Sequence, residues 1–170
     1  MTNQLKTLLR GARRLFGDSQ TGYAQDILKG AEGFYKGAEA YNRGDYAAAL
    51  REWRPLAEQG NEEAQTMLGS MYSEGLGVIQ DYKEAVKWYR LAAEQGGASA
   101  QNNLGDMYRN GQGVIQDNVT AHMWFNIAAS NGNEYAGLLR GLVAGQMTPS
   151  QLDEATKLAR ECVRKEYKGC

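Results

Sequence analysis

The sequence predicts an all-α fold in which helix-turn-helix units stack into an α-solenoid, and three observations support it. The chain of 170 residues has 21 glycines but only 2 prolines, and it is rich in the helix formers Ala, Leu, Glu and Gln. Apolar side chains recur with helical period. A glycine-rich phrase, LGSMYSEGLGVIQD from Leu68, returns thirty-six residues later as LGDMYRNGQGVIQD from Leu104. A repeat of that length is typical of solenoid proteins.

The composition is that of an ordinary globular protein large enough for one substantial core, with 42% hydrophobic and 23% charged residues. The formal net charge is -1, and the body of the chain beyond Gly17 has no cluster of basic residues that resembles a basic stripe. Nucleic acid is therefore not expected as a partner. Every apolar run is shorter than the roughly eighteen residues of a membrane span.

Residues 1–22 are predicted to form a basic amphipathic helix and a turn. Up to Gly17 this segment has four Lys and Arg side chains and no acidic one. The helix is expected to cap the first repeat or to contact a partner, and contact with an anionic membrane is the less favoured alternative. The segment lacks the unbroken apolar core of a secretory signal. The compartment therefore stays open: cytoplasmic, or periplasmic or secreted if a signal preceded this sequence.

Three equivalent phrases divide the rest of the chain: LAEQGNEEA from Leu56, AAEQGGASA from Ala92 and AASNGNEYA from Ala128. We expect a longer helix over about 23–42 to open the array. The predicted units are an entry repeat at 23–60, two full repeats at 61–96 and 97–132, and a partial terminal repeat with a capping helix at 133–170.

The first helix of each full repeat has an apolar stripe at helical period. In the second unit the stripe is Ala64, Leu68, Met71 and Tyr72. Gly69 and Gly105 directly follow the leucine of the stripe. Because a glycine within a helix costs about 1 kcal/mol relative to alanine, we expect these glycines to admit a closely packed helix.

The second helix of the unit is predicted to begin after Asp81, with Glu84 as the partner in a carboxylate capping box. It is predicted to end at Gly96, because a helix commonly ends at a residue in the left-handed conformation, which glycine adopts without strain. Gly60 and Gly132 occupy the same position in the neighbouring units. Its apolar arc consists of Ala85, Trp88, Tyr89, Ala92 and Ala93.

The glycines of the repeated phrase are predicted to build a turn between the two helices. Gly75 and Gly111 would end the first helix, and Gly77 and Gly113 would reverse the chain. A phosphate-binding loop is excluded, because these glycines follow a helix rather than a strand and no Gly-Lys-Ser/Thr is present.

The stretches AQTMLGSMYSEGLGVIQDYKEAVKWYRLAAEQG and AQNNLGDMYRNGQGVIQDNVTAHMWFNIAASNG resemble the Sel1-like repeat family, relatives of tetratricopeptide repeats. AYNRGDYAAALREWRPLAEQG from Ala40 resembles a shorter, tetratricopeptide-like entry repeat. MTPSQLDEATKLARECVRKEYKGC resembles the closing helix of exported bacterial members. The resemblance spans about 33–170. It implies a right-handed superhelical stack that binds other proteins, in a bacterium.

The terminal unit departs from the repeat, because Arg140 replaces the leucine of the stripe and Gly137 replaces the glutamine. It is not expected to pack another full unit. Thr148, Pro149 and Gln151 provide an N-cap, a first-turn proline and a capping-box partner for a last helix that runs to about 167 and covers the stack.

Cys162 and Cys170 are eight residues apart. One interpretation is a buried thiol and an exposed one; the other is a disulfide formed by a tail that turns back at Gly169. The resemblance to exported members favours the disulfide.

The sequence offers little for catalysis, so we predict that the protein is not an enzyme and has no metal or cofactor. His122 is the only histidine, and the two cysteines are not spaced as a zinc pair. No serine lies in a nucleophile elbow, and no two carboxylates stand out as an acid and base pair.

The predicted function is that of a non-catalytic scaffold that binds a protein or peptide segment in the concave groove of the stack. The candidate contacts face away from the apolar stripe, although solvated surface is an equal alternative for each: Thr66, Ser70, Ser73, Asn102, Asp106 and Arg109. The aromatic residues are expected in the core rather than in a binding cage: Trp53, Trp88, Trp124, Tyr72 and Tyr108.

Alternative functions are an envelope enzyme, a cell-wall-binding protein, or an adaptor held to a membrane through residues 1–17. A monomer or a weak homo-oligomer is expected.

Overall fold

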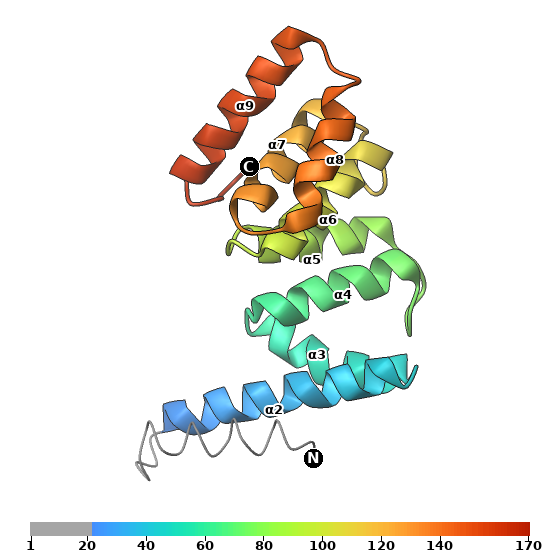
Figure 1. The fold of residues 1–170 in the computed structure, drawn as a ribbon. Helices are drawn as coiled ribbons and strands as arrows, with labels where there is room; N and C mark the ends of the chain where they lie inside the picture. Colours follow the sequence, from blue (N-terminus) through green and yellow to red (C-terminus); the bar gives the residue numbers. More distant parts are fainter. Residues whose placement is uncertain (1–21) are drawn as a thin grey trace.

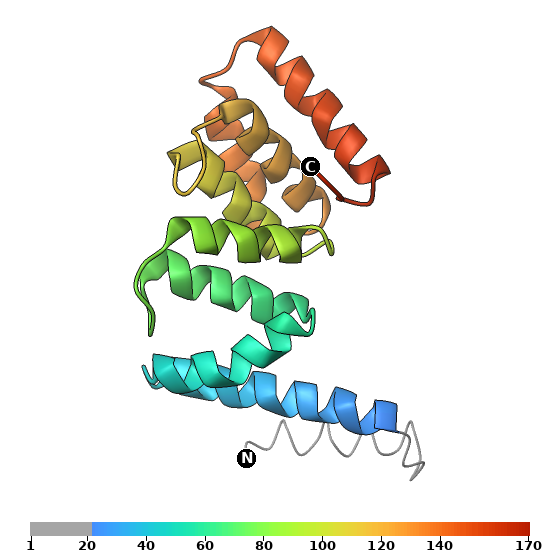
Figure 2. The same cartoon turned by 180° about the vertical axis from the view of Figure 1, so that it is seen from behind.

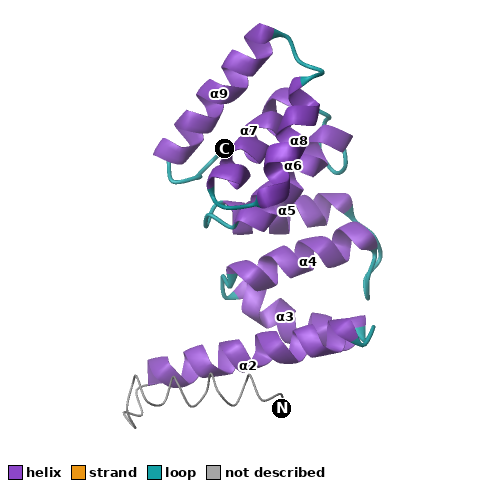
Figure 3. Ribbon diagram, viewed as in Figure 1, coloured by secondary structure: helices purple, strands orange, loops and turns teal. Residues whose placement is uncertain are grey.

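The fold comes from a computed structural model, which describes residues 22–170. Within that range the chain forms eight α-helices and no strand (Figure 3). The helices are α2 (Gly22–Asn42), α3 (Tyr46–Glu58), α4 (Glu62–Glu74), α5 (Tyr82–Ala93), α6 (Ala98–Asn110), α7 (Asn118–Ser130), α8 (Glu134–Ala144) and α9 (Pro149–Arg164).

The helices stack in sequence order from α2 at one end to α8 and α9 at the other (Figures 1 and 2). Each of the first three pairs packs internally, α2 on α3, α4 on α5 and α6 on α7, and each pair packs on the next. The predicted all-α solenoid is confirmed, and so is the long helix that opens the array. The basic segment predicted at residues 1–22 lies outside the described residues except for its last position.

Aspartates cap the second helices as predicted. Asp81 Oδ1 accepts hydrogen bonds from the backbone N–H groups of Lys83 at 2.9 Å and Glu84 at 3.0 Å. Asp45 and Asp117 occupy the same place in α3 and α7. The reciprocal bond of the predicted capping box does not form: the Asp81 N–H donates to the Tyr72 carbonyl at 2.9 Å, and the Glu84 carboxylate pairs with Lys87 Nζ at 2.6 Å.

The repeated glycines do build the turn. Gly75 and Gly111 end α4 and α6 in the left-handed conformation, with φ of 71° and 66°. Gly77 has a φ of 70°, and a Cβ built there would lie 2.9 Å from the backbone carbonyl carbon of Tyr46. The connector therefore lies directly against the start of the second helix of the preceding pair, which leaves no room for a side chain.

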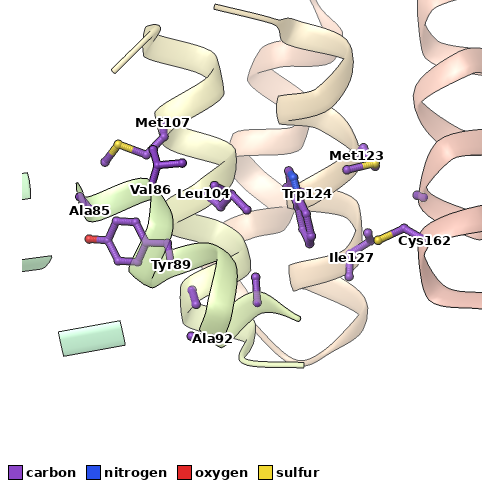
Figure 4. Close-up of a cluster of buried hydrophobic side chains, with 13 residues drawn as sticks. Ala85, Val86, Tyr89, Ala92, Leu104, Met107, Met123, Trp124, Ile127 and Cys162 are labelled. Atoms are coloured by element: carbon purple, nitrogen blue, oxygen red, sulfur yellow. The ribbon is translucent and has the colours of Figure 1, made fainter. Parts of the chain in front are cut away.

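The buried residues form three hydrophobic clusters along the stack. Its largest fully buried side chains include Leu68, Leu104, Trp53, Trp124 and Phe125. Figure 4 shows the central cluster, in which Tyr89 of α5, Leu104 of α6, Trp124 of α7 and Cys162 of α9 all take part.

A polar bond recurs between successive pairs. Arg54 Nη2 donates to the Tyr72 hydroxyl at 3.0 Å, and Arg90 Nη2 donates to the Tyr108 hydroxyl at 2.8 Å. Each bond joins the second helix of one pair to the first helix of the next. This recurrence holds the pairs in one register.

The C-terminal end follows the prediction with one correction. Thr148 and Gln151 form the capping box. The predicted end near Tyr167 is wrong, because α9 ends at Arg164 and Tyr167 has a left-handed φ of 66°. That turn brings the tail back, and the structure contains the Cys162–Cys170 disulfide.

Candidate interaction site

The six predicted contact residues lie in one register on two first helices, and all are half-buried. Thr66, Ser70 and Ser73 belong to α4, and Asn102, Asp106 and Arg109 occupy the equivalent positions of α6. We call them the α4 row and the α6 row. The structure gives the two rows different hydrogen bonding.

The hydroxyls of the α4 row are already bonded within the chain. Thr66 Oγ1 donates to Glu62 Oε1 at 3.1 Å, and Ser73 Oγ donates to the Ser70 carbonyl at 3.0 Å. Ser70 Oγ accepts from the Tyr89 hydroxyl at 3.1 Å. Burial raises the pKa of Tyr89, and the bonds to Ser70 and Ser73 oppose that shift. The α4 row therefore helps to hold α5 against α4.

The α6 row has unused bonding capacity. Asn102 Oδ1 and Arg109 Nε are buried atoms that find no hydrogen-bond partner among the described residues. Asp106 Oδ1 lies 2.6 Å from Arg109 Nη2, an ion pair without the geometry of a hydrogen bond. Burial raises the pKa of Asp106, and the charge of Arg109 opposes that shift. These atoms are themselves covered, so they can bond to a group outside the chain only after their side chains rotate outward.

The same register continues onto α8 with apolar side chains, which sequence reasoning missed. Leu138 and Leu142 stand thirty-six residues after Asn102 and Asp106. Leu138 is 71% exposed and Leu142 is 63% exposed. Tyr135, one turn earlier, is 74% exposed. We call Tyr135, Leu138 and Leu142 the α8 face. The repeat register applied to 133–144 was the signal that could have located it.

An open hollow of about 680 Å³ lies between the first half of α2 and the turn from α3 to α4. Its lining includes Ile27, Ala31, Phe34, Tyr35, Leu56 and Glu63. It is mostly apolar, and no sequence motif predicted it.

His122 is buried on α7, with 7% of its surface exposed. Burial lowers its pKa, and the positive charge of Arg140 lowers it further. Among the described residues no group of three or more His, Cys, Asp or Glu side chains could hold a metal ion.

The aromatic residues lie in the core as predicted. Trp53 and Trp124 are fully buried, and Trp88, Tyr72 and Tyr108 pack against the core clusters. None of the described helices is both long and apolar enough to cross a membrane.

Comparison with known proteins identifies the repeated unit. The sequence profile described as Sel1 repeat matches residues 62–97 and 98–133, one residue later than the predicted units. No curated protein matches the chain.

Two solved structures are similar. One is a protective antigen of uropathogenic Escherichia coli strains that displays an SLR fold, with 30% identity and a TM-score of 0.73 over 88% of this chain. The other is a Sel1 repeat protein from Oxalobacter formigenes, with 35% identity and a TM-score of 0.62 over 65% of this chain. The chain spans 32% of the length of the first protein and 45% of the second.

Proposed function

The chain carries two Sel1 repeats and is a Sel1-like repeat protein, and from this premise we propose that it is a non-catalytic scaffold that binds a segment of a partner protein along its first helices. Sel1 repeat proteins commonly serve as protein-interaction scaffolds and are generally non-catalytic. The partner segment lies across the α6 row and extends toward the α4 row.

The observation that carries the proposal is the bonding capacity of the α6 row. A buried polar atom without a hydrogen bond costs about 1–3 kcal/mol, and a partner that supplies the bond recovers that cost. When the two side chains rotate outward, Asn102 Oδ1 accepts from a backbone N–H of the partner and Arg109 Nε donates to a carbonyl. An extended peptide offers both groups at every residue.

The α4 row has the smaller part in this proposal. Its hydroxyls hold α5, so a partner that bonded to them would compete with bonds inside the chain. The α4 row therefore supplies a rigid edge beside the α6 row, and most of the binding free energy comes from Asn102, Asp106 and Arg109.

The test is capture of partners from a lysate of the protein's own cells on the immobilised chain, followed by mass spectrometry and titration with the purified partner. Replacement of Asn102, Asp106 and Arg109 by alanine is expected to weaken binding at least about tenfold, the equivalent of 1.4 kcal/mol. Thr66, Ser70 and Ser73 replaced together should have a smaller effect.

A matched control replaces Lys83, Lys87 and Leu91, three exposed residues of α5, by alanine. It should leave the affinity unchanged. Unchanged affinity in the α6 variant, with circular dichroism equal to wild type, would remove the α6 row from the proposal.

A further inference from the structure

In each of the first three helix pairs, an aromatic ring of the second helix lies over a glycine of the first. The α6–α7 pair is representative: Phe125 stands eight residues after the N-cap Asp117, and a Cβ built on Gly105 would lie 2.8 Å from its ring. Real Cβ atoms do not lie this close to a ring carbon, so only glycine leaves room for the ring at this position. The rings are Trp53, Tyr89 and Phe125, over Gly37, Gly69 and Gly105.

The last pair keeps the glycine and lacks the ring. Gly141 stands thirty-six residues after Gly105, and a Cβ built on it would have no atom of another helix within 4 Å. Counted from the N-cap Thr148, the place of the ring falls on Thr156, and α9 contains no Phe, Tyr or Trp. The helix α9 packs on α7 rather than on α8. In Figure 1 it leans away from α8 at its C-terminal end.

The surface of α8 around Gly141 is apolar. Leu138 and Leu142 lie together on one side of Gly141, and with Tyr135 they form the exposed α8 face. A second glycine, Gly137, is one turn away and also has open space at its Cβ position. An exposed apolar stripe beside glycines is where a helix can approach another helix closely.

We infer that the α8 face is a docking site for an amphipathic helix of a partner protein, which places an aromatic ring over Gly141. The partner helix takes the place that α5 and α7 occupy in the preceding pairs, because the glycine that receives their ring is retained and the ring is missing. The site goes beyond the proposed function: its ligand is a helix, and its contacts are apolar and outside the α6 row.

A peptide of α5 serves as the probe, because α5 is a natural ligand of a first helix. The peptide YKEAVKWYRLAAE, residues 82–94, is stapled between Lys83 and Lys87, which face solvent, and carries fluorescein at its N-terminus. Fluorescence anisotropy follows its titration with the full chain. Saturable binding is expected, and replacement of Tyr89 by alanine in the peptide should weaken it at least about tenfold.

Gly141→Ala in the full chain is the sharpest variant. It adds one methyl group at the seat of the ring, favours the helix and removes no apolar surface, so the chain stays folded while peptide affinity falls at least about tenfold. Leu138→Ser should weaken binding as well. Ile115→Ser is the matched control, since it removes an aliphatic side chain that is 90% exposed in a connector, and it should bind as wild type.

The variant with alanine at Asn102, Asp106 and Arg109 should also bind the peptide as wild type, which separates this site from the proposed function. Equal affinity of the wild type and Gly141→Ala, or no binding at all, overturns the inference. So does preferential binding of a peptide of residues 1–17, which would make the chain's own N-terminus the occupant. A dimer that Leu138→Ser dissociates would instead identify a second copy.

Discussion

The helix pairs α6–α7 and α8–α9 follow the same repeat register but differ where the first helix of each pair meets the second helix of the preceding pair. Gln101 donates to a backbone carbonyl of α5 at 3.1 Å, and Leu104 is fully buried. At the equivalent places Gly137 has no side chain to form that bond, and Arg140 donates to Asn126 Oδ1 at 2.6 Å. A small number of positions therefore changes how α8 packs on the preceding helix α7.

The consequence is a different division of surfaces at the end of the stack. In the α6–α7 pair the two helices bury each other. In the last pair α9 buries Ala155, Ala159 and Cys162 on α7 and the central core, while one face of α8 stays exposed. The terminal pair thus closes the core and leaves an exposed apolar face, whereas the candidate site in the middle of the molecule, the α6 row, is polar.

The largest expected effect tests the stripe position itself. Leu104→Ala removes a fully buried side chain and should lower the free energy of unfolding by about 3 kcal/mol. Arg140→Ala, the matched change in the last pair, should cost only about 1 kcal/mol, because it removes a half-buried side chain with one hydrogen bond. Urea unfolding followed by circular dichroism measures both. Similar losses would mean that the last pair packs like the others.

The two glycines should respond with opposite signs. Gly105→Ala forces a methyl group against the Phe125 ring and should destabilise the protein by about 2 kcal/mol. Gly141→Ala meets open space in a helix and should stabilise it by up to about 1 kcal/mol. Thermal unfolding of both variants against wild type gives the comparison. Destabilisation by both substitutions would contradict the open seat on α8.

The disulfide cross-links only the terminal part of the chain, after α9 begins. Cys170→Ser opens the Cys162–Cys170 loop and should lower stability by about 1–2 kcal/mol, because the loop is short. The tail then depends on weaker bonds, such as that of Lys168 Nζ to the Glu94 carbonyl at 3.0 Å. Melting with and without reductant checks this: reductant should lower the Tm of wild type and leave that of Cys170→Ser unchanged.

The smallest expected effect is a pH dependence from the α7–α8 interface. The folded-state pKa of His122 is lowered by burial and by Arg140, so the unfolded chain binds a proton more readily than the folded one. Stability should therefore be complete above the ordinary His pKa of about 6.5 and fall as pH drops through it. His122→Gln should flatten the profile of unfolding free energy between about pH 7.5 and 5.5. An unchanged slope would place the titration elsewhere.

Asp106 supplies the opposite sign in another window. Its folded-state pKa is raised, so protonation favours the folded chain, and this contribution grows only as pH falls toward the acidic range.

Local signals in the sequence were sufficient for most of the fold. The N-caps Asp45, Asp81 and Asp117 and the capping box at Thr148 mark the starts of helices, and Gly75 and Gly111 mark ends. Each signal depends on residues within a few positions of one another, so no knowledge of the tertiary structure is needed to interpret it. The repeat spacing then extends one unit to its copies.

The candidate site was predictable only in part. The repeat register located both the α4 row and the α6 row, but only the structure shows that the Tyr89 hydroxyl bonds to Ser70 of the α4 row. Phe125, at the equivalent position of α7, has no hydroxyl to offer the α6 row. The choice between two thiols and a disulfide also stayed open, because it depends on where the tail returns after α9.

The sequence by itself determined the helices, their turns and the order in which the pairs stack, because these follow from backbone preferences and from a repeated apolar pattern. Only the tertiary structure decided that α9 packs on α7 and not on α8, so that Gly141 and its neighbouring leucines remain uncovered. That choice depends on competing surfaces far apart in the chain, where the most favourable burial prevails over the register of the repeat.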